Sequence, residues 1–187
     1  MGELTAPWAE RLDAVLDEAA RLGFLGGGPA AVHRDHALGF VAVVARTEGH
    51  VVDLGTGGGV PGLVLAAALA PRTVVCVERR ARRAAFLRMA TVRLGLANAV
   101  VEASDVAALI AGDHWTGAGA VTARSFGPPA VTMKAGSALL APGGLLVVSE
   151  PPADEDRWAA AALHGLELAE RTMGWPRLAV LRLRPAT

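Results

Sequence analysis

Apolar residues recur at helical spacing in the first part of the chain. They are Trp8, Leu12, Val15, Leu16 and Ala19, and they predict an amphipathic helix. The glycine-rich segment 23–29 ends that helix. A second helix is predicted over about 32–46. We interpret residues 1–47 as a helical extension that packs on the rest of the chain.

From residue 48 onward, short apolar runs alternate with helical patterns. The runs predict strands near 50–54, 73–77, 98–102, 119–123 and 144–149. The segments between them predict helices near 61–70, 80–94, 105–111 and 128–140. This alternation implies an α/β domain over 48–187, with a mostly parallel sheet and helices on both faces.

The end of the chain follows a different pattern. After Pro151-Pro152, a polar helix is expected from about Asp154. Two apolar stretches, 166–173 and 178–183, then predict a closing antiparallel hairpin.

The composition supports one substantial core. The chain has 187 residues, 52% of them hydrophobic, and a mean hydropathy of +0.39. Its apolar runs are too short to span a membrane, and Glu3 and Glu10 lie where a signal peptide would be basic. The single cysteine, Cys76, allows no internal disulfide, and the histidines show no metal-ligand spacing. We therefore expect a cytoplasmic protein with no membrane or metal partner.

Positive charge gathers in one predicted helix although the net charge is zero. Residues 79–93 include six arginines and no acid. A neutral chain does not hold nucleic acid by bulk electrostatics, but a basic face can still dock a phosphate backbone. Arg82, Arg83 and Arg88 are the candidates for such contacts. The alternative is a solvated helix surface whose arginines pair with acids elsewhere.

A glycine-rich loop follows the first predicted strand. Its sequence is Asp53-Leu-Gly-Thr-Gly-Gly-Gly59, and Val60-Pro61-Gly62 leads on into a helix. Glycines allow the backbone to approach a ligand closely, and the amino end of a helix offers unpaired N–H groups. The arrangement is typical of a site for a nucleotide-like cofactor.

Asp53 bears on which cofactor this loop suits. The run from Gly57 to Gly62 also satisfies the dinucleotide pattern, with Glu78 following 78 − 57 = 21 residues later. A carboxylate at Asp53 would repel a pyrophosphate, whereas S-adenosylmethionine carries an ammonium and a sulfonium. The sequence therefore favours S-adenosylmethionine, and a dinucleotide enzyme or a purely structural glycine turn are the alternatives.

Ligands of an open parallel sheet bind at the carboxyl ends of its strands. Glu78 ends the second strand, where a carboxylate accepts ribose hydroxyls or caps the next helix. Asp105 and Val106-Ala107 follow the third strand and either meet an adenine edge or form an ordinary helix start. Arg124 and Phe126 follow the fourth strand and suit a contact with cofactor or substrate. The alternative is that Arg124 is an ordinary surface residue and Phe126 an ordinary core residue.

Four segments match one known family in order and spacing. They are 53–62, 82–88, 94–98 and the run Ala-Arg-Ser-Phe at 123–126. The chain resembles the small-subunit ribosomal RNA guanine-N7 methyltransferases, historically called glucose-inhibited division protein B, over about 36–150. The resemblance implies a Rossmann-like class I methyltransferase that uses S-adenosylmethionine to methylate guanine N7 in 16S ribosomal RNA or the small ribosomal subunit.

Taken with the strand ends, the resemblance gives two sets of site residues. The expected cofactor-binding residues are Asp53, Gly55, Thr56, Gly57, Val60, Glu78, Asp105, Val106, Ala107 and Arg124. The expected RNA-contacting residues are Arg82, Arg83, Arg88, Arg124 and Phe126. No catalytic residue is assigned, because guanine N7 has a free lone pair and its attack needs alignment and desolvation.

The chain departs from the family pattern mainly on the expected substrate side. The family has a histidine in the helix before the first strand, and here it is His36. The family's arginine next to that histidine is replaced by Asp35, and its aspartate three residues later is replaced by Gly39. After the fifth strand, Ser149-Glu150 replaces a frequent lysine-glycine pair. Two alternatives follow: a small-molecule methyltransferase on the same scaffold, and a non-catalytic protein that binds S-adenosylmethionine.

Overall fold

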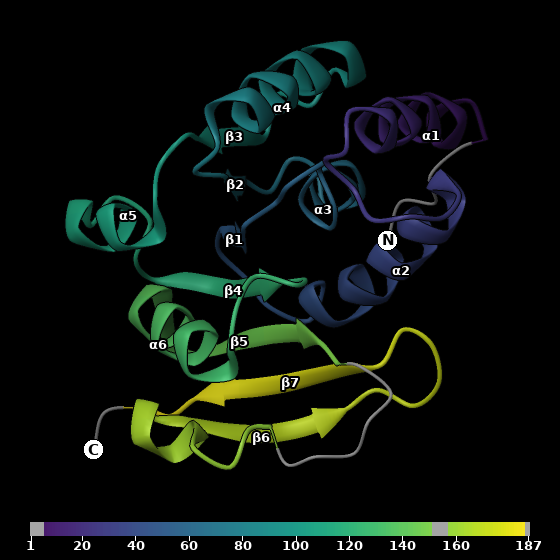
Figure 1. Cartoon of the computed structure of the whole chain (residues 1–187). Helices are drawn as coiled ribbons and strands as arrows, with labels where there is room; N and C mark the ends of the chain where they lie inside the picture. Colours follow the sequence, from purple (N-terminus) through teal and green to yellow (C-terminus); the bar gives the residue numbers. More distant parts are fainter. Residues whose placement is uncertain (1–5, 151–156, 186–187) are drawn as a thin grey trace.

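The computed structural model describes residues 6–150 and 157–185 (Figure 1). The helices are α1 Ala6–Arg21, α2 Ala30–Val44, α3 Gly62–Ala68, α4 Ala81–Leu94, α5 Val106–Gly112, α6 Pro129–Leu139 and the 3-10 helix η1 Ala161–His164. The strands are β1 Val51–Leu54, β2 Val74–Val77, β3 Ala99–Glu102, β4 Ala118–Ala123, β5 Leu140–Ser149, β6 Leu166–Arg171 and β7 Leu178–Leu183.

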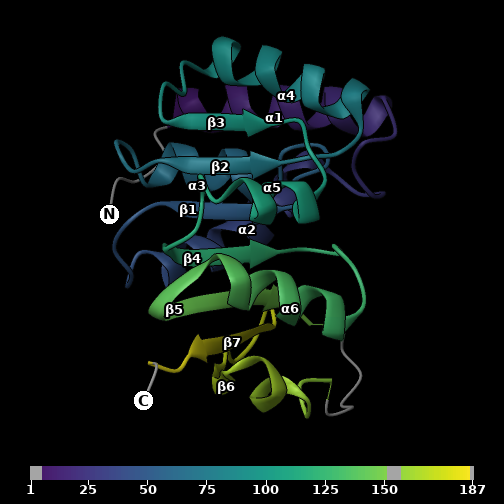
Figure 2. The ribbon, with the colours of Figure 1, turned by 90° about the vertical axis from the view of Figure 1, so that its left-hand side faces the viewer.

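The strands form one sheet in the order β3-β2-β1-β4-β5-β7-β6. Strands β1 to β5 pair in parallel, and β7 pairs antiparallel with both β5 and β6. Figure 2 shows the parallel strands pointing to the right, with β7 running against them. This architecture confirms the predicted α/β class and the predicted closing hairpin.

Helices cover both faces of the sheet. Apolar side chains of α1, α2, α3 and α4 share one core with alternate strand residues such as Val51, Val74 and Val147. Residues of α5, α6 and η1 share a second core with the opposite set, including Val52, Val75 and Val148. Central strands buried on both faces explain why their sequences are almost continuously apolar. The division into a helical extension at 1–47, packed on a domain at 48–187, stays a prediction.

Two predicted elements differ from the structure near the end of the chain. β5 begins at Leu140, earlier than expected. The prediction placed its start later because Pro142-Gly143-Gly144 interrupts the apolar run, but the strand continues through this segment with a shift in its register against β4. The polar helix expected from Asp154 begins outside the described residues, and the described part, 157–164, forms turns and η1. No helix in the described ranges is long and apolar enough to cross a membrane.

Candidate functional site

Asp53 anchors the glycine loop from below. Its Oδ1 accepts a hydrogen bond from Thr122 Oγ1 at 2.7 Å, and its Oδ2 accepts from Thr56 Oγ1 at 2.8 Å and from the Gly62 N–H at 3.0 Å. The carboxyl group is fully buried, and burial raises its pKa to about 6 against the opposing effect of these hydrogen bonds and of the Arg124 charge. Asp53 therefore fixes the shape of the loop and lines neither cavity itself.

Gly62 shows why the first turn of α3 needs a glycine. A Cβ at this position would lie 2.7 Å from Cys76 Sγ and 2.9 Å from Asp53 Oδ2. Both distances are shorter than real Cβ contacts allow. The missing side chain lets the helix start pack directly on β1 and β2.

Glu78 ties the glycine loop to the end of β2. Its Oε2 accepts from the Gly57 N–H at 3.1 Å, and its Oε1 accepts from the Arg80 N–H at 2.8 Å. The carboxylate is almost completely buried but lines a cavity at the carboxyl edge of the sheet. The bond to the Arg80 N–H fits the helix-capping role, and the position of Glu78 in the cavity wall leaves the ribose contact as a prediction.

Two cavities meet over the glycine loop. The first, which we call the α5 cavity, has a volume of about 520 Å³ and includes Glu78, Ser104 and Val106 in its lining. The second, the α2 cavity, has a volume of about 680 Å³ and includes His36 and Arg124. Gly55, Arg83 and Phe126 line both. A Cβ on Gly55 would lie 3.0 Å from Phe126 Cδ2, so the phenyl ring lies over the loop at the boundary of the cavities.

The cavities divide the predicted cofactor residues into two groups. Thr56, Gly57, Val60 and Arg124 line the α2 cavity, and Glu78, Asp105, Val106 and Ala107 line the α5 cavity. Gly55 lines both, and Asp53 lines neither. A ligand that contacts residues of both groups must therefore extend from one cavity to the other across Gly55.

Asp105 begins α5 as a helix cap. Its Oδ1 accepts from the Ala107 N–H at 2.9 Å, as the structural alternative predicted. The neighbouring Ser104 hydroxyl is buried in the cavity wall with no hydrogen-bond partner among the described residues. A buried hydroxyl of this kind suits a polar edge of a ligand.

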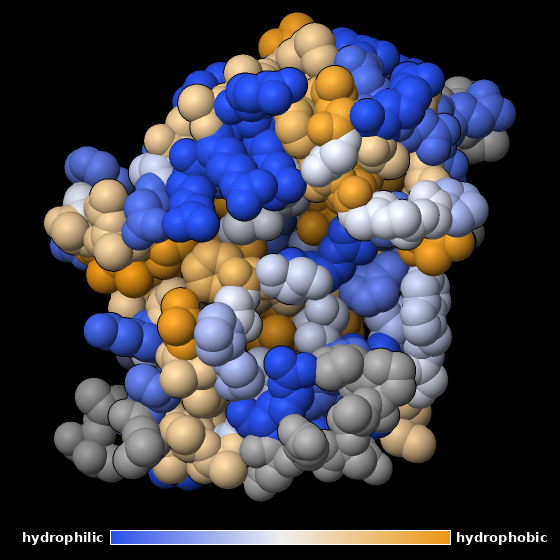
Figure 3. All heavy atoms as spheres, viewed as in Figure 1, coloured by the Kyte–Doolittle hydropathy of each residue, from blue (hydrophilic) through white to orange (hydrophobic). Residues whose placement is uncertain are grey.

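The basic helix presents two kinds of arginine. Arg82 and Arg88 are exposed and line neither cavity. Arg83 turns inward: its Nη2 donates to the Gly23 carbonyl at 3.4 Å, its guanidinium lies 5.6 Å from the centre of the Phe24 ring, and Nη1 lies 4.0 Å from Glu78 Oε2. Hydrophilic surface near the start of α4 borders a hollow in the middle of the molecule (Figure 3). The three predicted RNA-contacting arginines therefore do not form one equivalent set.

Sequence reasoning missed a contact between α2 and the end of β4. Arg124 Nη1 lies 3.1 Å from His33 Nδ1, and His33 Nε2 lies 3.1 Å from the Gly26 carbonyl oxygen. Since a guanidinium only donates, Nδ1 must accept and Nε2 must carry the proton. The spacing of His33 and His36, one helical turn apart, was the available signal.

A second missed group lies at the end of β5. Glu150 and Trp158 both line the α2 cavity, and Trp158 Nε1 donates to Glu150 Oε1 at 2.7 Å. The position of Glu150 after a parallel strand was the available signal. Over 6–150 and 157–185, no cluster of three or more His, Cys, Asp or Glu side chains is placed to hold a metal ion.

Comparisons of the sequence point to one family. The GidB family model, described as rRNA small subunit methyltransferase G, matches residues 33–164. A ribosomal RNA small subunit methyltransferase G from Stenotrophomonas maltophilia (strain R551-3) is 35% identical over 128 residues, which cover 68% of this chain and 54% of the relative. The protein of that name from Halorhodospira halophila (strain DSM 244 / SL1) is 35% identical over 154 residues, which cover 78% of this chain and 70% of the relative.

Solved structures share the fold at low sequence identity. An O-methyltransferase from Bacillus cereus in complex with SAH has a TM-score of 0.67 at 14% identity, with 94% of this chain and 91% of that chain covered. A SAM-dependent O-methyltransferase from Thermotoga maritima has a TM-score of 0.63 at 14% identity, with 92% and 72% covered. These similarities concern the fold: the sheet and its helices are arranged as in these Rossmann-like structures.

Proposed function

The chain belongs to the GidB family, and on that premise we propose that it is an S-adenosylmethionine-dependent methyltransferase that modifies guanine N7 in 16S ribosomal RNA. We place its action in the cytoplasm, on the small ribosomal subunit. The chain spans about half the length of several curated relatives, with 54% and 50% of two of them covered. Because the match covers only part of these relatives, the proposal is argued from the site residues of this chain, first for the cofactor and then for RNA.

The residues present fit the cofactor. The α5 cavity offers a carboxylate at Glu78 and a buried, unpartnered Ser104 hydroxyl among the described residues, and its volume of about 520 Å³ is within the usual range for small-molecule sites. We assign Glu78 to the ribose hydroxyls and the start of α5 to the adenine edge. The Asp105 carboxylate is engaged by Ala107, so its part is to hold that helix start in place.

The remaining cofactor contacts extend into the α2 cavity. Gly55, Thr56, Gly57 and Val60 offer close backbone approach along the loop, while Asp53 fixes the loop from below. Arg124 is mostly buried, and burial lowers its pKa against the opposing pull of Asp53. A guanidinium keeps its charge even so, and Arg124 is suited to hold a carboxylate or an electron-rich base edge in that cavity.

The chemistry needs little from the side chains beyond positioning. The bound cofactor supplies a methyl group on a positively charged sulfur. Guanine N7 supplies a lone pair, so the work of the chain is to align the base and exclude water. Phe126, at the boundary of the two cavities, is suited to stack on the base or wall the site. Arg82 and Arg88, exposed on the basic helix, are suited to phosphate contacts.

One observation carries the proposal most strongly. The Glu78 carboxylate holds the Gly57 N–H at 3.1 Å while it lines the α5 cavity. This hydrogen bond joins the acid that we assign to the ribose to the glycine loop, 21 residues earlier in the sequence. The two sequence motifs therefore form one site. This supports the cofactor assignment independently of any relative's name.

The proposal is tested by transfer of radiolabelled methyl from S-adenosylmethionine to small ribosomal subunits that lack the family's modification. We expect label in 16S RNA with the wild-type protein and little with Glu78→Gln, which keeps the shape of the side chain but removes its charge. Glu167→Gln is the matched control, since Glu167 is exposed on β6 and pairs with Arg184 at 3.2 Å. Absence of label, with cofactor binding still measurable by calorimetry, would contradict RNA methylation and favour a small-molecule or non-catalytic protein.

A further inference from the structure

The turn between β6 and β7 lies beside the α2 cavity. This turn, residues 172–177, leads directly into Leu178, which pairs with Ser149 at the carboxyl end of β5. The Trp175 ring lies edge-on to the His36 ring, with 5.5 Å between their centres. His36 itself lines the α2 cavity. The turn therefore lies at the edge of the α2 cavity, in which Arg124 is suited to hold a base edge, and we place the target base there.

The turn is held in one shape by its own hydrogen bonds. Thr172 Oγ1 donates to the Pro176 carbonyl at 2.8 Å and accepts from the Leu178 N–H at 2.9 Å. The Pro176 ring packs so closely on α2 that a Cβ on Gly39 would overlap it. The glycine that departs from the family pattern is therefore what allows this turn to dock on α2.

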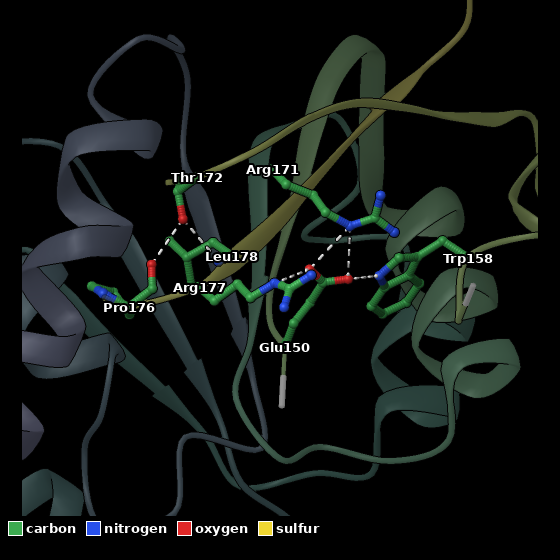
Figure 4. Close-up of polar contacts among 7 residues, drawn as sticks. All are labelled: Glu150, Trp158, Arg171, Thr172, Pro176, Arg177 and Leu178. Carbon is green, nitrogen blue, oxygen red and sulfur yellow. Dashed lines mark hydrogen bonds and ion pairs between the residues drawn. The ribbon is translucent and has the colours of Figure 1, made fainter. Parts of the chain in front are cut away.

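Glu150 fixes the turn from the other side (Figure 4). Its carboxylate, 4% exposed, accepts from Trp158 Nε1 at 2.7 Å and Arg171 Nε at 3.2 Å, and Arg177 Nε lies 3.7 Å away. The two arginine side chains are each 35% exposed. Because the acid is buried and both arginine side chains are partly exposed, this group of one carboxylate and two guanidinium groups carries a net positive charge beside the turn.

This braced turn nevertheless exposes large apolar groups. Met173 is 97% exposed and Trp175 is 62% exposed. A tryptophan held rigidly at the surface loses little conformational freedom on binding, and its ring stacks on any nucleobase. Proteins that bind single-stranded nucleic acid combine positive charge with an aromatic ring on which a base can stack.

We propose that the turn 172–177 is an RNA-binding element in which Trp175 stacks on an unpaired nucleotide next to the target guanine. This inference rests on the proposed function, because it assigns a contact to the same RNA substrate. It adds a site at the rim of the α2 cavity, separate from the basic helix α4. Glu150 is a positioning residue in this site, since it acts through the arginines and the turn.

The test compares Trp175→Ala and Trp175→Phe with Leu168→Ala, a control at a side chain 37% exposed on β6 of the same hairpin. We would measure affinity for protein-free 16S RNA and for small subunits, together with S-adenosylmethionine affinity and thermal melting. Removal of one stacking interaction should weaken RNA binding roughly tenfold in the alanine variant. The phenylalanine variant should recover most of that affinity, and the control and all cofactor affinities should stay unchanged.

A second measurement uses the unaltered protein. Acrylamide quenching of tryptophan fluorescence should fall when 16S RNA binds, and this protection should be smaller in Trp175→Phe, where Trp158 of the α2 cavity still contributes. Equal RNA affinity of wild-type and Trp175→Ala proteins would overturn the inference and leave the proposed function standing. Weaker binding seen only with small subunits, not with free RNA, would overturn it in favour of a ribosomal-protein contact. A wild-type protein that binds no RNA would overturn both.

Discussion

The carboxylate of Asp53 accepts a hydrogen bond from the Gly62 N–H at 3.0 Å, across the turn between β1 and α3. The same carboxylate receives the hydroxyls of Thr56 and Thr122. These bonds connect β1, β4, the glycine loop and the first turn of α3 at one buried point. The shape of the loop therefore depends on a buried group that lines neither cavity.

The ionisation of Asp53 should leave a signature in the pH dependence of stability. Its folded-state pKa is raised from 3.8 to about 6. The folded protein thus holds this proton more tightly than the unfolded chain, and the resulting stability is complete below about pH 4 and lost as pH rises through 6. Asp53→Asn removes this titration. We expect the unfolding free energy of wild type minus variant, from urea titrations, to fall between pH 4 and 7; a constant difference would contradict the assigned burial effect.

Gly62→Ala should destabilise the protein. The new Cβ would lie 2.7 Å from Cys76 Sγ and 2.9 Å from Asp53 Oδ2, so β1 and α3 would have to separate. Overpacking of this kind costs about 1–3 kcal/mol. Gly27→Ala is the control, because a Cβ there meets nothing within 4 Å. Denaturant unfolding should show a lower midpoint for Gly62→Ala alone, and equal midpoints would show that the loop tolerates the extra volume.

His33 should act through Arg124. His33→Asn retains an acceptor near Nδ1, whereas His33→Gln places its amide near Nε2 and His33→Ala retains neither. Since the bond from Arg124 involves a charged donor, its removal costs about 1.5–3 kcal/mol, or roughly tenfold and more in affinity. Calorimetric titration with S-adenosylmethionine should show His33→Ala and His33→Gln weakened and His33→Asn closer to wild type. If all three variants bind equally, the orientation of Arg124 does not depend on His33.

The arginines of α4 should separate by function. Arg82→Glu and Arg88→Glu should weaken RNA binding and reduce its salt dependence by about 0.7–0.9 in log–log slope for each phosphate that is no longer neutralised, with cofactor affinity unchanged. Arg83→Glu should also weaken cofactor binding, because it would place an acid within reach of Glu78 and Phe24. RNA titrations at several salt concentrations, with calorimetry for the cofactor, check both statements. Identical effects of all three reversals would mean that Arg83 belongs to the exposed set.

The sequence predicted the sheet because its central strands are short, apolar and separated by helical patterns. Asp53 and Glu78 became candidates because both stand near strand ends, where position alone indicates a ligand edge, and their part in binding a ligand stays a prediction. The start of β5 was missed because Pro142-Gly143-Gly144 reads as a turn, although the ladder with β4 accommodates it through a register shift.

The partners of the site could not be read in the same way. His33 meets Arg124 across 91 residues of sequence, which depends on how α2 crosses the end of β4. Arg171 and Arg177 reach Glu150 because of the length and shape of the β6–β7 turn. Contacts of this kind follow from packing between elements, and no local pattern records them.

The identity of the methylated nucleoside tests the central claim most directly. Small subunits that lack the family's modification would be incubated with the protein and S-adenosylmethionine, and the nucleosides of their 16S RNA would be separated and analysed by mass spectrometry. We predict 7-methylguanosine with the wild-type protein and its disappearance with Glu78→Gln. The absence of 7-methylguanosine from the wild-type reaction, with cofactor binding intact, would contradict methylation of guanine N7 by this chain.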